Sequence, residues 1–519
     1  MDASMEWSEG YVADVPYTTE FFGEQAPDFL NCVAIINGYE PVATDKPFTY
    51  FELGCGHALT LNILAAGNPL GQFYGVDFMP SHIAAGCALA DAAKLDNLTL
   101  LDSSFADLAS GKVADIPQCD FITLHGVYSW ISADNQQHIV SFIRQYLKPG
   151  GIVYVSYNAL PGWNAAMPLS RLLVAHANLH PAQSTIQLQH AAAFIQQFDI
   201  EQAGFFSTTP ALKDLLGVLN RYNPTYLVHE YLNQNAAPLY HMDLVRDLGS
   251  AKMDYVGSAD LCQAYPDLYF NEQKLALINA VPNSPLRETV KDFLLNTRFR
   301  KDVFVRGARK MGITRQKALL KKITLALVVP KQGVQLNGLN AGTMTFNVHQ
   351  DIILPAIEAL AICPRTLAEL ATLPSLEKES LIEIAKLAMM LTTANQTTVC
   401  TDRPRNVSAT ARLNLAIAHE LHYSDQYGAL ASPAVGSGIA LNPVELLVYG
   451  ILRKPSPPNG QDVGTIALEV QKILDDRGRR LRVNGVPIES EKQNMAEITR
   501  HVTATLKAKL PLWRQLGIL

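Results

Sequence analysis

The stretch Phe51-Glu52-Leu53-Gly54-Cys55-Gly56-His57-Ala58 decides the fold of this chain. The apolar and aromatic run that leads into it, from Phe48 to Leu53, is typical of a buried strand, and the run after it opens an amphipathic helix. Gly54 allows a tight turn, and Gly56 removes the Cβ that would hold a ligand away from the backbone. A strand, a glycine turn and a helix in this order present backbone N–H groups to a ligand at the carboxyl edge of an α/β sheet.

Three features around this turn indicate which ligand it binds. Glu52 stands where dinucleotide folds usually have an apolar residue, and a carboxylate there suits a ligand with a positive amino group and no phosphates. The next strand, 72–77, ends in Asp77, an acid suited to a ribose diol. A third strand, 97–102, runs into the polar and aromatic residues Ser104 and Phe105, which form a rim for adenine. This combination favours S-adenosylmethionine over NAD.

The chain resembles the class I S-adenosylmethionine-dependent methyltransferases in its segments 52–56, 74–77 and 147–151. A narrower resemblance rests on Val15-Pro-Tyr17, Leu124-His-Gly-Val-Tyr-Ser-Trp130, Tyr154-Val-Ser-Tyr-Asn-Ala-Leu-Pro-Gly-Trp163 and His229-Glu-Tyr-Leu232. Together these motifs look like the bacterial methyltransferases that carry a methyltransferase regulatory domain. That group includes rickettsial protein-lysine methyltransferases acting on outer-membrane proteins. The specific motifs lie in the larger, N-terminal part of the chain, and the remainder is similar in layout only.

Composition excludes several classes of protein. A chain of 519 residues is long enough for about three or four domains, and its net charge of -6 argues against a dedicated nucleic-acid binder. Its seven cysteines show no CxxC spacing, so we expect a reduced, cytoplasmic protein without a metal site. The acidic N-terminus lacks the apolar core of a signal peptide, and no run approaches the ~20 apolar residues of a membrane span. We therefore expect neither a membrane nor nucleic acid as a partner.

The order of predicted elements divides the chain into domains. Strands and helices alternate through residues 1–163, with a fourth strand at 119–124, a helix stopped at 148–151 and a fifth strand at 152–157. Residues 164–238 are helical, and residues 239–308 return as helix, strand, helix and strand, the order in which class I methyltransferase sheets end. The sequence thus predicts a Rossmann-like α/β domain over 1–163 and 239–308. The helical insertion would serve substrate recognition or homodimerisation.

Two further domains are predicted after the sheet domain. Residues 309–405 resemble a winged-helix unit with helices at 351–360, 365–371 and 378–390 and a wing strand at 397–401. The third helix carries a balanced set of charges, which favours protein contact over DNA reading. Residues 406–519 are expected to form an α+β C-terminal domain. The basic stretch from Arg298 to Lys322 is interpreted as a solvated face rather than a site for an acidic partner.

The resemblance also implies the residues that hold S-adenosylmethionine. They are Tyr17, Glu52, Gly54, Cys55, Gly56, Asp77, Phe78, Ser104, Phe105 and His125. Glu52 and the glycine turn would line the methionine part, Asp77 would accept the ribose hydroxyls, and Phe78 would lie beside adenine. Ser104 takes the place of the acid that the family usually has after the third strand. Tyr17 is either a lid contact or a packed aromatic residue.

The predicted catalytic residues follow the fourth and fifth strands: His125, Tyr128, Tyr157 and Asn158. Tyr128 and Tyr157 would position the substrate, and His125 would either accept a proton or hydrogen-bond the loop. Methyl transfer from a sulfonium is a direct displacement in which orientation supplies most of the effect. Desolvation and the nearby sulfonium charge lower the pKa of a lysine ammonium from ~10.4, so a dedicated base is optional.

The sequence favours a protein amine as the acceptor. The Asn/Asp-Pro-Pro-aromatic motif of methyltransferases acting on nucleobase amines is missing after the fourth strand, and no cluster of acids suits the magnesium of catechol-type enzymes. We therefore expect an enzyme that methylates lysine side chains of a protein substrate. Two alternatives stay open: a small-molecule N- or O-methyltransferase, for which residues 346–519 would be dispensable, and a catalytically silent regulator that binds the cofactor.

Overall fold

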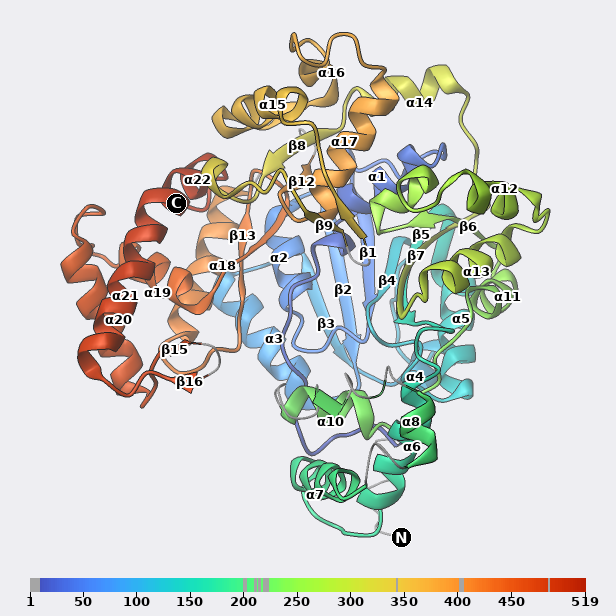
Figure 1. Cartoon of the computed structure of the whole chain (residues 1–519), viewed down its shortest axis with the longest axis horizontal. Coiled ribbons are helices and arrows are strands. Elements are labelled where there is room, and N and C mark those ends of the chain that lie inside the picture. Colours follow the sequence, from blue (N-terminus) through green and yellow to red (C-terminus); the bar gives the residue numbers. More distant parts are fainter. Residues whose placement is uncertain are drawn as a thin grey trace.

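A seven-stranded sheet forms the centre of the molecule (Figure 1). The computed structural model describes residues 10–198, 203–209, 212, 216–217, 224–341, 344–400, 406–483 and 486–519. The strands of the sheet are β1 (Phe48–Leu53), β2 (Gly71–Asp77), β3 (Leu98–Asp102), β4 (Cys119–Leu124), β5 (Leu147–Asn158), β6 (Met253–Ser258) and β7 (Phe299–Arg306). Their order is β3-β2-β1-β4-β5-β7-β6, with only β7 antiparallel to its neighbours. The order reverses between β1 and β4, which opens a crevice at their carboxyl ends.

Helices cover both faces of this sheet, as the predicted α/β class requires. They are α1 (Pro27–Ile36), α2 (Leu59–Gly67), α3 (Pro80–Ala93), α4 (Phe105–Ala109), α5 (Ala133–Tyr146), α11 (His241–Gly249), α12 (Glu272–Ala280) and α13 (Ser284–Leu295). Successive residues of β1 point to opposite faces, so Tyr50 packs in one core and Phe51 in the other. Burial on both faces explains why this strand is a continuous apolar run.

Most strand predictions are confirmed, with one correction at β5. The fourth strand begins and ends as predicted, at Cys119 and Leu124. The segment 148–151, expected to separate a helix from the fifth strand, belongs to β5 itself. Leu147 pairs with Cys119, and a register shift follows before Ile152 pairs with Phe121. With this register shift, β5 begins at Leu147, five residues before the apolar run that starts at Ile152.

The helical insertion leaves the sheet after β5 and returns at α11. Its described helices are α6 (Ala166–Ala177), α7 (Ser184–Gln196), α8 (Gly204–Thr208) and α10 (Pro224–Tyr231). They pack around a core of their own that also takes in Val12 and Val15 of the N-terminal segment. Part of the predicted range 164–238 lies outside the described residues. The insertion forms the lower lobe in Figure 1, next to the carboxyl edge of the sheet.

The middle part of the chain packs on the sheet domain. It contains α14 (Ile313–Leu320), α15 (Gln350–Ile362), α16 (Leu367–Leu370), α17 (Leu381–Thr393), a hairpin of β9 (Leu339–Ala341) and β10 (Met344–Phe346), and a sheet of β11 (Arg365–Thr366), β8 (Thr324–Leu327) and β12 (Thr397–Cys400). The Sγ atom of Cys32 in α1 lies 3.6 Å from the Sδ atom of Met389 in α17, and Lys386 of α17 pairs with Asp267. The third predicted helix therefore contacts the sheet domain with part of its surface, and Lys386 is not a free charge for DNA.

The C-terminal part continues the layer of helices on one face of the sheet. Its elements are α18 (Val407–Glu420), β13 (Ala429–Ser432), β14 (Ser437–Ala440), α19 (Pro443–Leu452), α20 (Val463–Asp476), β15 (Arg482–Val483), β16 (Val486–Pro487), α21 (Glu491–Ala504) and α22 (Leu510–Gln515). Helix α18 packs against α2 and α3, and Nε of Arg412 donates to the carbonyl oxygen of Ala93 at 2.7 Å. Asn68 donates in the same way to Gly436 at 2.7 Å. Among the helices that the structure describes, none combines the length and apolar character needed to cross a membrane.

Candidate active site

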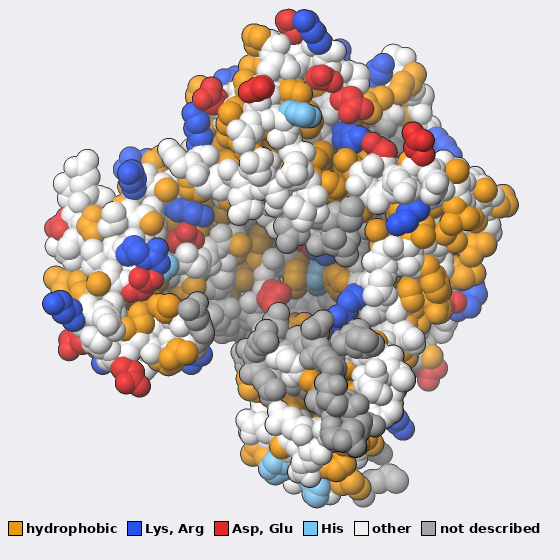
Figure 2. Space-filling model, in the orientation of Figure 1, with side chains coloured by type: hydrophobic (Ala, Val, Ile, Leu, Met, Phe, Trp, Pro, Cys, Tyr) orange, Lys and Arg blue, Asp and Glu red, His pale blue; other side chains and the backbone are white. Residues whose placement is uncertain are grey.

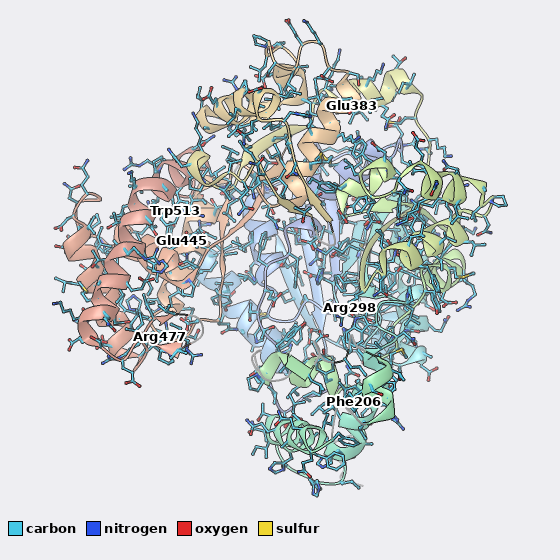
Figure 3. The ribbon with its side chains drawn as sticks, viewed as in Figure 1. Phe206, Arg298, Glu383, Glu445, Arg477 and Trp513 are labelled. Carbon is cyan, nitrogen blue, oxygen red and sulfur yellow. The ribbon has the colours of Figure 1, made fainter. Side chains whose placement is uncertain are left out.

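Two cavities meet at the carboxyl edge of the sheet, between the glycine turn and the insertion. Their volumes are about 380 Å³ for the first cavity and about 500 Å³ for the second cavity. The residues that line both are Tyr17, Gly54, Gly56, His125, Gly126, Trp130 and Glu230. Figure 2 shows the surface hollowed in this region, and Figure 3 shows Arg298, which lines the second cavity, near the centre of the molecule above the insertion.

The glycine turn has the shape that the sequence predicts. Gly54 and Gly56 both have positive φ angles, +72° and +52°. A Cβ at Gly56 would meet no heavy atom within 4 Å, so this residue faces open space, whereas a Cβ at Gly54 would lie 2.6 Å from Cγ2 of Val127. The amides of Gly54 and Cys55 both donate to the carbonyl oxygen of Val76, at 2.8 and 2.9 Å. These bonds hold the turn against β2.

Asp77, at the end of β2, is held rigidly beside this turn. Its Oδ2 accepts from the amide of Gly56 at 2.9 Å, and its Oδ1 accepts from the amide of Met79 at 3.0 Å and lies 3.3 Å from Nδ1 of His82. Phe78 follows, with its ring in edge contact with Tyr11 at 5.4 Å. Asp77 and Phe78 both line the first cavity. The carboxylate is thus fixed in place before any ligand contacts it.

Ser104 and Phe105 also line the first cavity, as expected. The hydroxyl of Ser104 caps α4, because it accepts from the amide of Asp107 at 3.1 Å and donates to Oδ2 of Asp107 at 2.9 Å. Asp102 and Asp107 line the same cavity and were not predicted. Two acidic side chains therefore lie near Ser104, one at the end of β3 and one in the first turn of α4.

Glu52 lines the second cavity, together with Cys55. Its Oε1 accepts from Nε2 of Gln25 at 3.1 Å, whereas Oε2 is buried and has no hydrogen-bond partner among the residues that the structure describes. Burial raises the pKa of this carboxyl to about 8, against the opposing effect of the Gln25 hydrogen bond. Gln25 lies outside every sequence motif, and its position next to Glu52 comes only from the packing of the N-terminal segment.

The rest of the second cavity is aromatic and acidic. Its aromatic side chains are Tyr17, Phe22, Trp130, Trp163, Tyr226, Tyr231 and Phe299, and its carboxylates are Glu20, Glu52 and Glu230. Trp130 and Trp163 lie edge to face at 6.1 Å, and the guanidinium of Arg298 lies 5.8 Å from the centre of the Trp163 ring. Aromatic faces and carboxylates both attract cations. Of these aromatic residues, the sequence predicted Tyr17 as a site residue and contained Trp130 and Trp163 in motifs of the resemblance, whereas Phe22 and Tyr226 were not predicted.

His125 lines both cavities, and its environment favours the hydrogen-bonding alternative. Its Nδ1 lies 2.9 Å from the hydroxyl of Tyr154, and its ring stacks on Phe22 with centroids 3.6 Å apart. Burial lowers the pKa of His125 to about 4, despite the carboxylate of Glu24 nearby. A base this weak is neutral at pH 7 and takes up protons poorly.

Tyr128 and Tyr157 do not face the site, which corrects the prediction that they position the substrate. Both are fully buried in the core that β4 and β5 share with α5 and α11. The hydroxyl of Tyr128 donates to Asp247 at 3.3 Å, and that of Tyr157 donates to Asp302 at 2.7 Å. Side chains alternate along a strand, so Tyr157 faces away from the second cavity while its neighbour Asn158 lines it.

Most of the basic stretch is exposed to solvent, as expected, but its part within β7 is not. Arg300 is 3% exposed and donates to Asp302 at 2.9 Å and to Asp292 at 2.7 Å. Lys301 pairs with Glu24 of the N-terminal segment. These pairs tie β7 to α13 and to the segment that covers the site.

Comparison with known proteins relates this chain to methyltransferases. A family model described as a methyltransferase domain matches residues 51–153, and one described as a predicted methyltransferase regulatory domain matches residues 223–306. The uncharacterized protein sll1526 of Synechocystis is 34% identical over 524 residues, covering 99% of this chain and 100% of the relative. The uncharacterized protein RP028 of Rickettsia prowazekii is 30% identical over 234 residues, covering 44% of this chain and 90% of the relative.

One solved structure extends the similarity of fold to the whole chain. The structure of PKMT2 from Rickettsia typhi in complex with AdoHcy matches with a TM-score of 0.69 at 20% identity. The match covers 97% of this chain and 100% of that one. The similarity in fold is therefore not confined to the seven-stranded sheet.

Proposed function

This chain belongs to the class I S-adenosylmethionine-dependent methyltransferases with a methyltransferase regulatory domain, and from that premise we propose that it methylates lysine side chains of a protein. The observation that carries the proposal is the second cavity, which offers aromatic walls and the carboxylates of Glu20 and Glu230 in addition to Glu52, which would serve the cofactor. A lysine side chain presents an apolar stem and a cationic head, which match these two features. The fold that this chain shares with PKMT2 over 97% of its length is consistent with a protein as the acceptor.

The residues present fit S-adenosylmethionine. The unpartnered Oε2 of Glu52 suits the amino group, and the space beside Gly56 admits the methionine part. Asp77 would hold the ribose, and Phe78 and Phe105 would flank the adenine. When bound, the cofactor supplies a methyl group on a sulfonium, so that the acceptor nitrogen forms the new N–C bond while the electrons of the C–S bond stay with sulfur.

The chain's own side chains orient the acceptor and exclude water. Tyr17 and Trp130 line both cavities, so they border the place where acceptor and cofactor meet. Their ring faces favour a cation over a neutral group of the same size. Neutral His125, stacked on Phe22 and bonded to Tyr154, holds the loop after β4 in position. Orientation in a site without bulk water supplies most of the rate effect in such a displacement.

Methyl-labelled S-adenosylmethionine tests this function. The purified protein is incubated with extract from its own source, and the label is followed into protein, nucleic-acid and small-molecule fractions. We expect base-stable label on lysine that disappears in Asp77→Ala. Asp120→Ala is the matched control, because Asp120 accepts from the amide of Thr49 at 2.8 Å and pairs with Lys148 at the opposite edge of the sheet. Label confined to small molecules would contradict the proposal. A protein substrate, a homodimer, a cytoplasmic location and a winged-helix middle domain stay predictions.

A further inference from the structure

Glu230 occupies a special position in the site. It lies near the end of α10, in the insertion, and it is half-buried. Among the residues that the structure describes, Glu230 is the one acidic side chain that lines both cavities. It therefore borders the junction at which an acceptor in the second cavity meets a methyl group presented from the first.

The groups that face Glu230 come from several elements. Tyr226, one turn earlier on α10, is a hydrogen-bond partner, and Arg298, just before β7, contributes a positive charge; both favour the carboxylate. Glu20 of the N-terminal segment disfavours it, and Tyr17 of the same segment is close enough to interact electrostatically. Burial outweighs these effects and raises the pKa of Glu230 to about 7. A proton acceptor works best when its pKa lies near the operating pH.

The other candidates at the second cavity are less suited to accept a proton from the acceptor. Glu52 is bonded to Gln25 and lies at the glycine turn, where it would serve the cofactor. Glu20 is exposed and does not line the first cavity. His125 is committed to Tyr154 and Phe22.

We propose that the second cavity binds the acceptor as an ammonium ion and that Glu230 is the carboxylate that recognises it and takes its proton. The N–H bond of the ammonium breaks, an O–H bond forms on Glu230, and the nitrogen keeps the electron pair that it needs as a nucleophile. Glu230 then returns its proton to solvent between turnovers. This inference rests on the proposed function for the reaction, but the recognition of an alkylammonium is tested separately.

The first test measures binding of n-butylammonium, a mimic of the lysine side chain, to the full chain saturated with S-adenosylhomocysteine. Isothermal titration calorimetry gives the dissociation constant for wild type, Glu230→Gln, Glu20→Gln and Glu358→Gln. We expect the affinity for n-butylammonium to fall at least about tenfold in Glu230→Gln. The fall should be smaller in Glu20→Gln, because the exposed carboxylate of Glu20 is more hydrated than that of Glu230. Glu358 is exposed, pairs with Lys331 in the middle part and serves as the matched control. An unchanged constant in Glu230→Gln overturns the proposal.

The second test is the pH profile of methyl transfer to poly-L-lysine. S-adenosylmethionine is kept saturating at every pH, so that the weaker cofactor binding expected from Glu52 at low pH does not affect the rate. Wild type should lose activity as the pH falls through about 7, and Glu230→Gln should lack this acid limb and be slower by about 10²-fold at pH 7. Tyr226→Phe removes a bond that stabilises the carboxylate, so the limb should move to higher pH. An unmoved limb in Tyr226→Phe contradicts the proposal, even if Glu230→Gln fails to fold.

The outcomes separate the two proposals. Loss of n-butylammonium binding in Glu230→Gln supports the recognition site, whichever amine is the acceptor. Failure of wild type to label any lysine refutes only the proposed function. Retention of S-adenosylhomocysteine affinity and of the thermal midpoint shows that the variant is folded.

Discussion

The free carboxyl oxygen of Glu52 leads to a prediction about cofactor binding. Because burial raises the pKa of Glu52 to about 8, the side chain is mostly protonated and neutral below that pH in the free protein. A ligand ammonium next to it favours the ionised form, so binding expels the proton. Affinity should therefore fall as the pH is lowered.

The size of this effect follows from the pKa. The protonated form exceeds the ionised form by roughly 100-fold at pH 6.0 and by only about threefold at pH 7.5. The dissociation constant of the ligand should thus be about 20-fold larger at pH 6.0 than at pH 7.5. The α-amino group of the ligand keeps its charge over most of this range, since its ordinary pKa is about 7.7–8.0. His57, His125 and His229 have pKa values of about 4, lowered chiefly by burial, and stay neutral throughout.

Isothermal titration calorimetry with S-adenosylhomocysteine measures this dependence. That ligand carries the amino group but lacks the sulfonium charge that Glu230 would sense. Titrations at pH 6.0, 6.5, 7.0 and 7.5, in buffers of different ionisation enthalpy, should show release of about one proton at pH 6.0. Glu52→Gln should bind with nearly constant affinity. An equally steep dependence in Glu52→Gln, or a flat one in wild type, would refute the role given to Glu52.

Three further predictions concern the scaffold. Gly54→Ala should destabilise the fold by about 1–3 kcal/mol and weaken S-adenosylhomocysteine binding, because its Cβ would lie 2.6 Å from Val127. Gly111 has the same φ of +72° but open space around its Cβ. Denaturant titrations of Gly111→Ala therefore measure the backbone strain alone, and the difference between the two variants gives the cost of the clash. Asp302→Asn should cost about 3–5 kcal/mol in the free energy of unfolding, because Asp302 is fully buried and its pKa is held low by a guanidinium and an imidazole; an unchanged denaturation midpoint would contradict this. Deleting residues 406–519 should expose the faces of α2 and α3 that α18 covers, so light scattering should detect aggregation, whereas a soluble and active fragment would favour the small-molecule alternative.

The local patterns of the sequence were sufficient for the sheet and the glycine turn. Strand β1 carries apolar residues on both faces, and two glycines with positive φ angles follow it. The strand conformation and the turn after it are therefore both determined by residues close together in the sequence. The same holds for helix caps: the side chain of Ser132 caps the start of α5, and that of Thr366 caps the start of α16. Such features depend on neighbours in sequence and can be read before the chain folds.

The direction of a side chain at a strand end was not predictable in this way. Tyr128 and Tyr157 stand in motifs near the site, yet both side chains are buried in the core that does not line it. Their hydroxyls donate to the half-buried carboxylate of Asp247 in α11 and to the buried carboxylate of Asp302 in β7. Those partners are far away in the sequence, and a shift of one residue in register reverses which face a side chain occupies.

The sequence by itself determined the fold of the sheet, the glycine turn and the place of Asp77 at the end of β2, because each rests on short-range periodicity and backbone geometry. Only the tertiary structure decided how the second cavity is enclosed. Gln25 and Tyr17 arrive from the N-terminal segment, and Glu230 arrives from the insertion. The resemblance implied a place for Tyr17, but no motif paired Gln25 with Glu52 or predicted Glu230 at the junction of the two cavities. The segments reach the site because their apolar residues pack together into a shared core over the edge of the sheet.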